Sequence, residues 1–183
     1  MQCIVKDGVD YNPNDDGVTH INVYSQANTE LGRWLSNFTA VEVESEVGGT
    51  FASLEALYHY LKIFRTYTLN RMSAHQDVIQ KLEELKTKTG RDAQVLGRDI
   101  KQMVRKKGVY TYEVPDEEFD RIFTNGLVTK LKSNEAMLSE LKDEISDGKP
   151  LLHYYVVGKN TLIHKKHFDW LPDRIMDALE QCY

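Results

Sequence analysis

Four functional groups lie close together on one predicted helix, formed by residues 53–64. At about 100° per residue, Glu55, His59 and Lys62 fall within an arc of roughly 60°. Tyr58 lies between this arc and the apolar stripe of the same helix. A half-buried glutamate in such a position can take up a proton or stabilise a cationic centre. Charged residues at i, i+4 and i, i+7 are also typical of a solvated helix face, so the spacing leaves both interpretations open.

A polar segment precedes this helix, and its sequence over residues 32–38 is Gly-Arg-Trp-Leu-Ser-Asn-Phe. Ser36 and Asn37 can hydrogen-bond the polar edge of a ligand, and Phe38 can stack on a planar ring. The alternative is a turn in which the serine and asparagine side chains satisfy nearby backbone groups.

A glycine in the middle of a later predicted helix is the third feature of interest. Gly97 costs that helix up to about 1 kcal/mol relative to alanine, which indicates that another element or a ligand approaches closely. Arg98 can bind a phosphate through two hydrogen bonds, or pair with Asp99 or another neighbour.

Composition excludes several classes of protein. The chain has 183 residues and a net charge of -5, so a strongly basic surface for non-specific duplex binding is absent. We expect no metal site, because His164-x-x-His167 lies in a predicted strand-to-loop segment and no Cys-x-x-Cys pattern accompanies it. No cofactor motif is recognisable either.

The two cysteines and the absence of long apolar segments indicate the compartment. No stretch of about 18 apolar residues and no signal-peptide pattern is present, so we expect no membrane association. Cys3 and Cys182 are then expected to be reduced in a cytoplasmic protein.

The order of predicted elements favours an α+β, mainly helical fold with a few short strands, in a single domain over residues 1–183. Predicted strands cover residues 20–25, 41–46, 151–157 and 161–164. Helices are expected to begin at Ser53, Ala74, Asp92, Pro115, Asn134 and near Pro172. Gly90 and Gly108 are expected to end the second and third of these helices.

Several short motifs agree in order and spacing with one known family. They are Val23-Tyr24-Ser25, Gly32 followed by Leu35-Ser36-Asn37-Phe38, Ser53-x-Glu55-x-x-Tyr58-x-x-x-Lys62, Gly97-Arg98-Asp99, and Lys130 followed by Asn134. Over residues 20–145 the chain thereby resembles the NADAR (YbiA-like) family.

This resemblance implies a mainly helical α+β fold and hydrolysis of an N-glycosidic bond between ribose and a base or amine. The family's substrates include phosphorylated riboflavin-pathway intermediates and ADP-ribose attached to guanine in nucleic acid, and no cofactor is implied. Glu55 would be the catalytic carboxylate. The implied ligand-binding residues are Tyr24, Ser36, Asn37, Phe38, Tyr58, His59, Lys62, Arg98, Asp169 and Trp170.

The chain also departs from the family pattern. Ala56 follows the glutamate where histidine is usual, and His59 stands where glutamine is usual. The C-terminal Asp-x-x-Trp-Gly element is not recognisable, and Asp169-Trp170 lies in roughly that region. Two alternatives therefore accompany the enzyme: a module that sequesters ADP-ribose or a related nucleotide without chemistry, and a partner-binding protein that kept the scaffold.

Overall fold

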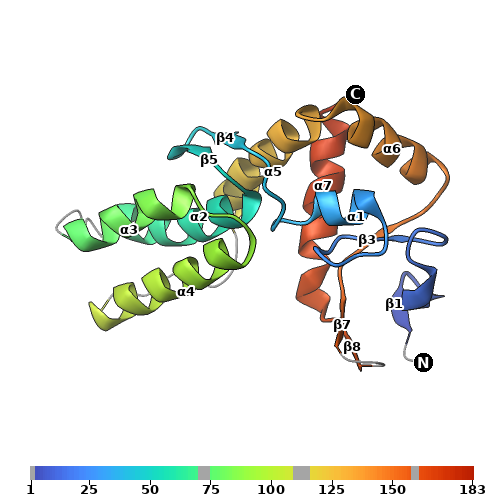
Figure 1. Ribbon diagram of the computed structural model, residues 1–183, viewed down its shortest axis with the longest axis horizontal. Helices are drawn as coiled ribbons and strands as arrows, with labels where there is room; N and C mark the ends of the chain where they lie inside the picture. Colours follow the sequence, from blue (N-terminus) through green and yellow to red (C-terminus); the bar gives the residue numbers. More distant parts are fainter. Residues whose placement is uncertain (1–2, 70–74, 109–115, 158–160) are drawn as a thin grey trace. The chain divides into compact units, whose positions relative to one another are not determined.

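The computed structural model describes residues 3–69, 75–108, 116–157 and 161–183, where most of the helices follow one another in a central stretch flanked by short strands (Figure 1). In chain order the elements are β1 (Ile4–Lys6), β2 (Val9–Tyr11), η1 (Pro13–Asp15), β3 (Ile21–Asn22), α1 (Glu30–Leu35), β4 (Val43–Ser45), β5 (Gly49–Phe51), α2 (Leu54–Leu69), α3 (Gln76–Lys86), α4 (Gly90–Lys106), α5 (Glu117–Lys132), α6 (Glu135–Ser146), β6 (Leu151–Leu152), β7 (Tyr155–Val157), β8 (Thr161–Ile163), η2 (Lys166–Phe168) and α7 (Trp170–Glu180). The mainly helical α+β class predicted from the sequence is confirmed.

The chain groups into two compact units. Unit 1 combines Met1–Ser36 with Leu131–Tyr183, and unit 2 is the continuous segment Asn37–Lys130. A single domain over the whole chain stays a prediction. No helix among the described residues is both long and apolar enough to cross a membrane.

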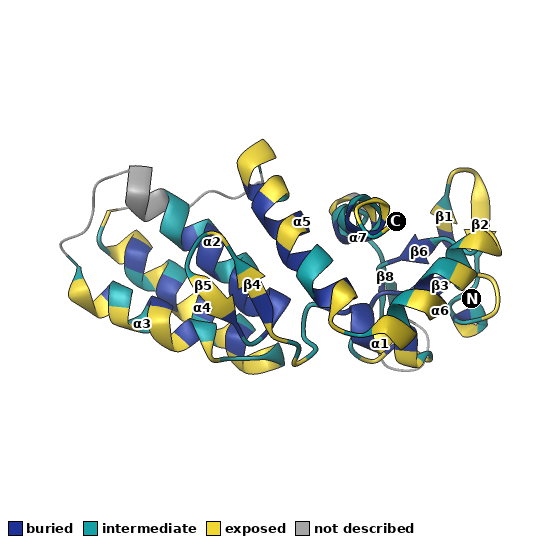
Figure 2. Cartoon of the chain, turned by 90° about the horizontal axis from the view of Figure 1, so that it is seen from above, coloured by how far each residue is buried: buried dark blue, intermediate teal, exposed yellow. Residues whose placement is uncertain are grey.

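In unit 2, helices α2, α3 and α4 pack against one another in pairs (Figure 1). Each buries an apolar stripe, and the exposed residues of α3 and α4 lie on the opposite faces, as Figure 2 shows. The buried side chains of the three helices include Leu54, Leu57, Leu61, Ile63, Val78, Leu82, Leu85, Ala93, Ile100 and Val104. An antiparallel β4–β5 hairpin precedes them and turns at Gly48-Gly49. The φ angles of these residues are 88° and 83°, which glycine adopts at little cost.

The start of α2 is fixed by a serine, as the sequence predicts. Ser53 Oγ accepts a hydrogen bond from the Ala56 backbone N–H at 3.2 Å, which caps the helix. The same hydroxyl donates to the Lys88 carbonyl at 3.1 Å. The first turn of α2 is therefore tied to the segment between α3 and α4.

Two of the predicted helix boundaries differ in the structure, and a third falls outside the described residues. Gly90 is the first residue of α4 and does not end α3, which stops at Lys86. The N-cap of α4 is Thr89, so Asp92 lies in its first turn and does not cap it. A glycine marks either end of a helix when φ is positive, and at Gly90 the value is 50°. The predicted helix start at Ala74 lies outside the described residues, and α3 begins at Gln76.

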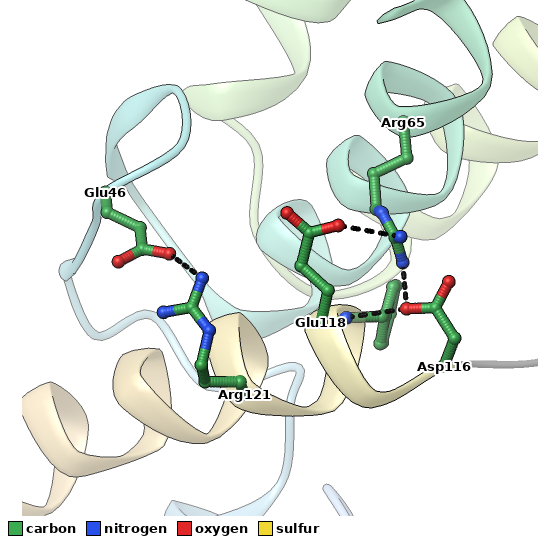
Figure 3. Close-up of polar contacts among 6 residues, drawn as sticks. Glu46, Arg65, Asp116, Glu118 and Arg121 are labelled. Carbon is green, nitrogen blue, oxygen red and sulfur yellow. Dashed lines mark hydrogen bonds and ion pairs between the residues drawn. The ribbon is translucent and has the colours of Figure 1, made fainter. Parts of the chain in front are cut away.

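Helix α5 is anchored by ion pairs at its first turns (Figure 3). Asp116 Oδ1 accepts the backbone N–H of Phe119 at 3.0 Å, and it also accepts a hydrogen bond from Arg65 of α2. Arg65 reaches Glu118 Oε2 at 2.8 Å as well, while Arg121 pairs with Glu46 of the β4–β5 turn. The hydrogen bond from Arg65, followed by that from the backbone, lowers the pKa of Asp116.

Unit 1 contains three short strand pairs and a buried polar network. Strands β1–β2 and β7–β8 are antiparallel, whereas β3 and β6 are parallel. The single strand predicted over residues 151–157 is divided into β6 and β7. Between them, the side chain of Asn22 accepts from the Tyr154 backbone N–H at 3.2 Å and donates to its carbonyl at 3.3 Å, so these groups do not pair with a strand.

The network continues through two further buried residues. Asp16 accepts hydrogen bonds at 2.8 Å from the backbone N–H groups of Asn22 and Asn28. His20 is fully buried, with Nε2 2.8 Å from Tyr154 Oη and Nδ1 3.0 Å from Thr19 Oγ1. Burial lowers the pKa of His20, because the protonated ring is poorly solvated there.

Candidate active site

Glu55 lies in the first turn of α2 and is only 7% exposed. Its backbone N–H donates to the Asn37 carbonyl at 3.0 Å, which holds this turn against the preceding segment. One turn further on, His59 Nε2 lies 3.0 Å from Glu55 Oε1. An ionised carboxylate only accepts hydrogen bonds, so the histidine donates through Nε2–H. The result is a buried carboxylate with a fixed orientation.

The imidazole of His59 fits against a gap in α4. A Cβ atom placed on Gly97 would lie 2.3 Å from His59 Cγ and 2.6 Å from its Nδ1, far inside van der Waals contact. The sequence predicted a close approach at Gly97, and the approaching group is this ring. Position 97 therefore has to be glycine for His59 to occupy its observed place.

The other half of the ridge is a tyrosine–lysine pair. Lys62 Nζ donates to Tyr58 Oη at 2.6 Å and lies 4.5 Å from the centre of its ring. Phe119 and Phe123 of α5 meet the tyrosine edge-on, with ring centroids 5.6 and 6.1 Å away. Burial, and secondly the negative charge of Glu55, raise the pKa of Tyr58 to about 12. The tyrosine is therefore a neutral hydrogen-bonding group at physiological pH.

Asn37 and Phe38 lie in the segment that leads to this helix, and both are half-buried. Asn37 Oδ1 is a buried oxygen that accepts no hydrogen bond within the described residues. A buried acceptor without a donor costs about 1–3 kcal/mol, which a ligand hydroxyl or amine would recover. Phe38 packs beside the start of α4, where its carbonyl would lie 3.4 Å from a Cβ on Gly90.

The remaining predicted residues are spread over both units. Arg98 is exposed on α4, next to Gly97. Tyr24 and Ser36 belong to unit 1, where the first packs edge-on against Tyr155 with ring centroids 4.8 Å apart and the second caps the end of α1. Asp169 and Trp170 also belong to unit 1. The former precedes α7 and lies 3.2 Å from His164 Nε2, and the latter is the first residue of the helix.

The structure thus brings five of the predicted residues together within unit 2. They are Asn37, Glu55, Tyr58, His59 and Lys62. Their assignment to a ligand stays a prediction. Among the described residues, no group of three or more histidine, cysteine or acidic side chains is placed to hold a metal ion.

Lys130, which the sequence offered only as part of a short motif, has an unusual environment. Lys130 of α5 is 1% exposed, and burial lowers its pKa from 10.5 to about 7. One turn earlier, a Cβ on Gly126 would lie 2.6 Å from Leu57 Cδ2, so this face of α5 packs on α2. The helical spacing of Phe123, Leu127 and Lys130 is the sequence signal that could have placed the lysine on the buried stripe of α5.

Comparisons with known proteins relate the chain to one solved structure. No protein-family model matches the sequence, and no curated protein matches it. The fold is similar to the NMR structure of the Escherichia coli protein YbiA, with a TM-score of 0.54 and 16% sequence identity, covering 91% of this chain and 90% of YbiA. This chain has a YbiA-like fold. At such low identity the likeness extends to the fold alone, and it agrees with the fold that the motif resemblance implied.

Proposed function

We propose that this protein is an N-glycosidase that hydrolyses the bond between ribose and a base or amine in an ADP-ribosyl or phosphoribosyl compound. The observation that carries the proposal is the position of Glu55, a buried carboxylate held by His59 in a YbiA-like fold. A solvated glutamate on an ordinary helix face would not be buried in this way.

The chemistry follows from the charge of the transition state. When an N-glycosidic bond breaks, positive charge develops at the anomeric carbon and the ring oxygen of the ribose. A carboxylate fixed beside that carbon stabilises the cation, or removes a proton from the attacking water. Because Glu55 already has one oxygen bound by His59, its orientation requires little reorganisation during the reaction.

Neighbouring groups fit the rest of such a substrate. The orphaned Asn37 Oδ1 can accept a hydrogen bond from a ribose hydroxyl. The ammonium group of Lys62, held by Tyr58, supplies a positive charge for a phosphate. The exposed guanidinium group of Arg98 on α4 supplies a second one. The substrate is then a phosphorylated ribosyl compound, either free or carried on guanine bases of nucleic acid.

Product release from two substrates tests the proposal. Wild-type protein is incubated with an oligonucleotide carrying ADP-ribosylated guanine and, separately, with a phosphoribosyl amine, and the products are quantified by mass spectrometry. Replacing Glu55 by glutamine should lower the rate at least 100-fold, which corresponds to about 3 kcal/mol of transition-state stabilisation. Glu117→Gln is the control, because this glutamate also lies in a first helical turn of unit 2 but is exposed.

Equal product release by wild type and Glu55→Gln would remove Glu55 from the mechanism. The missing Trp-Gly element favours the alternative of a sequestering module, and calorimetry separates it from the enzyme. Tight binding of ADP-ribose without turnover of any substrate would support sequestration. If the protein neither binds ADP-ribose nor turns over any substrate, the remaining alternative is a partner-binding protein that kept the scaffold.

A further inference from the structure

We infer that His59 is the positioning residue for Glu55, and that Gly97 leaves the space that the His59 ring occupies. This inference rests on the proposed function, because it assigns a role to a residue that acts through the proposed catalytic carboxylate.

The contact between the two side chains is shielded from water. The side chain of His59 is 15% exposed and that of Glu55 is 9% exposed, with 3.0 Å between Nε2 and Oε1. A hydrogen bond to a charged acceptor in such surroundings is stronger than one in bulk water. The two residues are one helical turn apart, so the backbone of α2 fixes the distance between them.

Two neighbours restrict the imidazole from other sides. The ring of Tyr58 meets it edge-on with centroids 5.4 Å apart. On α4, a Cβ atom at position 97 would overlap the His59 ring, with predicted distances of 2.3 Å to Cγ and 2.6 Å to Cβ and Nδ1. These atoms join the ring to the backbone and are not the end of a flexible chain. The ring therefore cannot move away from an added methyl group without displacing Nε2.

Two amino acids can serve in this place for the same reason. Glutamine carries an amide N–H₂ that can donate to the carboxylate one turn before it, as the Nε2–H of histidine does. The planar imidazole has a fixed donor direction, whereas the amide has more rotatable bonds. The common requirement is a donor at this position, and Gly97 provides the space for the bulkier ring.

Kinetic analysis of four variants tests the inference. His59→Ala should lower kcat by 10- to 100-fold with a smaller change in KM, because a misdirected carboxylate affects the transition state more than binding. His59→Gln should recover most of that loss. Gly97→Ala should resemble His59→Ala, since its methyl group displaces the ring. Gly126→Ala is the matched control, because the added methyl group meets flexible side-chain ends, Leu57 Cδ2 at 2.6 Å and Leu54 Cδ2 at 3.5 Å, and not the ring of His59.

Nuclear magnetic resonance gives a readout that does not depend on turnover. In isotope-labelled protein, His59 should show a protonated Nε2 whose resonance shifts in Glu55→Gln and in Gly97→Ala but not in Gly126→Ala. An unprotonated Nε2, or full activity of His59→Ala, would overturn the positioning role. If the wild type turns over no substrate while the imidazole signals behave as expected, the proposed function fails and the Glu55–His59 pair stands as a structural contact.

Discussion

Replacing Lys130 by methionine should stabilise the protein at neutral pH. The side chain is 1% exposed, and burial lowers its pKa from 10.5 to about 7. In the unfolded chain the same amine is almost fully protonated at pH 7, so folding has to release part of a proton and bury the rest of the charge. Methionine has a similar length and no charge, so it avoids this cost but also loses the interaction that the Lys130 side chain makes in the folded state.

The magnitude follows from the difference between the two pKa values. A difference of about 3.5, at roughly 1.4 kcal/mol each, sets an upper limit near 5 kcal/mol, of which roughly 4 kcal/mol applies at pH 7. Because the folded-state pKa is the lower one, the folded state binds fewer protons between pH 7 and 10.5. The wild type therefore gains stability as the pH rises through this range, by about 1.4 kcal/mol per pH unit from this group.

Urea unfolding at several pH values measures the effect. Far-ultraviolet circular dichroism follows the helices of both units, and tryptophan fluorescence follows unit 1 alone, because Trp34 and Trp170 both lie there. Lys130→Met should exceed the wild type by at most roughly 4 kcal/mol at pH 7, and this advantage should fall by about 3.5 kcal/mol at pH 10. Lys132→Met on the exposed face of α5 should change stability by no more than about 0.5 kcal/mol. A variant that is less stable by the same amount at both pH values would refute the reasoning, since the charge would then be stabilised where it lies.

Two further predictions concern the fold. Ser53→Ala removes the cap of α2 and the contact with the Lys88 carbonyl, so it should lower the free energy of unfolding by about 1 kcal/mol. An unchanged midpoint of urea unfolding would contradict this prediction. Burial holds the pKa of His20 in the folded state below its ordinary value of 6.5, so the stabilising contribution of the neutral ring is present above that pH and is lost as the pH falls below it. Tryptophan fluorescence, which reports on Trp34 and Trp170 of unit 1, should show this loss below pH 6.5, and the loss should be smaller in His20→Gln.

The parts of the fold that could be predicted from the sequence are those whose causes are local. The apolar spacing and Ser53 placed the start of α2, and Asn134 placed the start of α6, because a cap acts on residues three positions away. The boundary between α3 and α4 could not be placed in this way. A glycine at position 90 suits either the end or the beginning of a helix, and tertiary contacts decide between them.

The same distinction applies to the candidate site. The ridge of Glu55, Tyr58, His59 and Lys62 is encoded by helical spacing within one segment, so the sequence alone could group these residues. The spacing left open whether the ridge was solvated or buried, because that depends on α4 and α5. The division of β6 from β7 was likewise hidden, since it arises when a side chain 132 positions away, Asn22, bonds the backbone of Tyr154.

This division between local and distant causes explains how a YbiA-like fold can coexist with 16% identity. A site built mainly on one helix needs few residues from elsewhere. Helices α4 and α5 pack closely on α2 because Gly97 and Gly126 carry no side chain there, and aromatic rings of α5 fill the remaining contact. Most other positions on those helices need only remain apolar on one face and polar on the other. Wide substitution is therefore compatible with this fold.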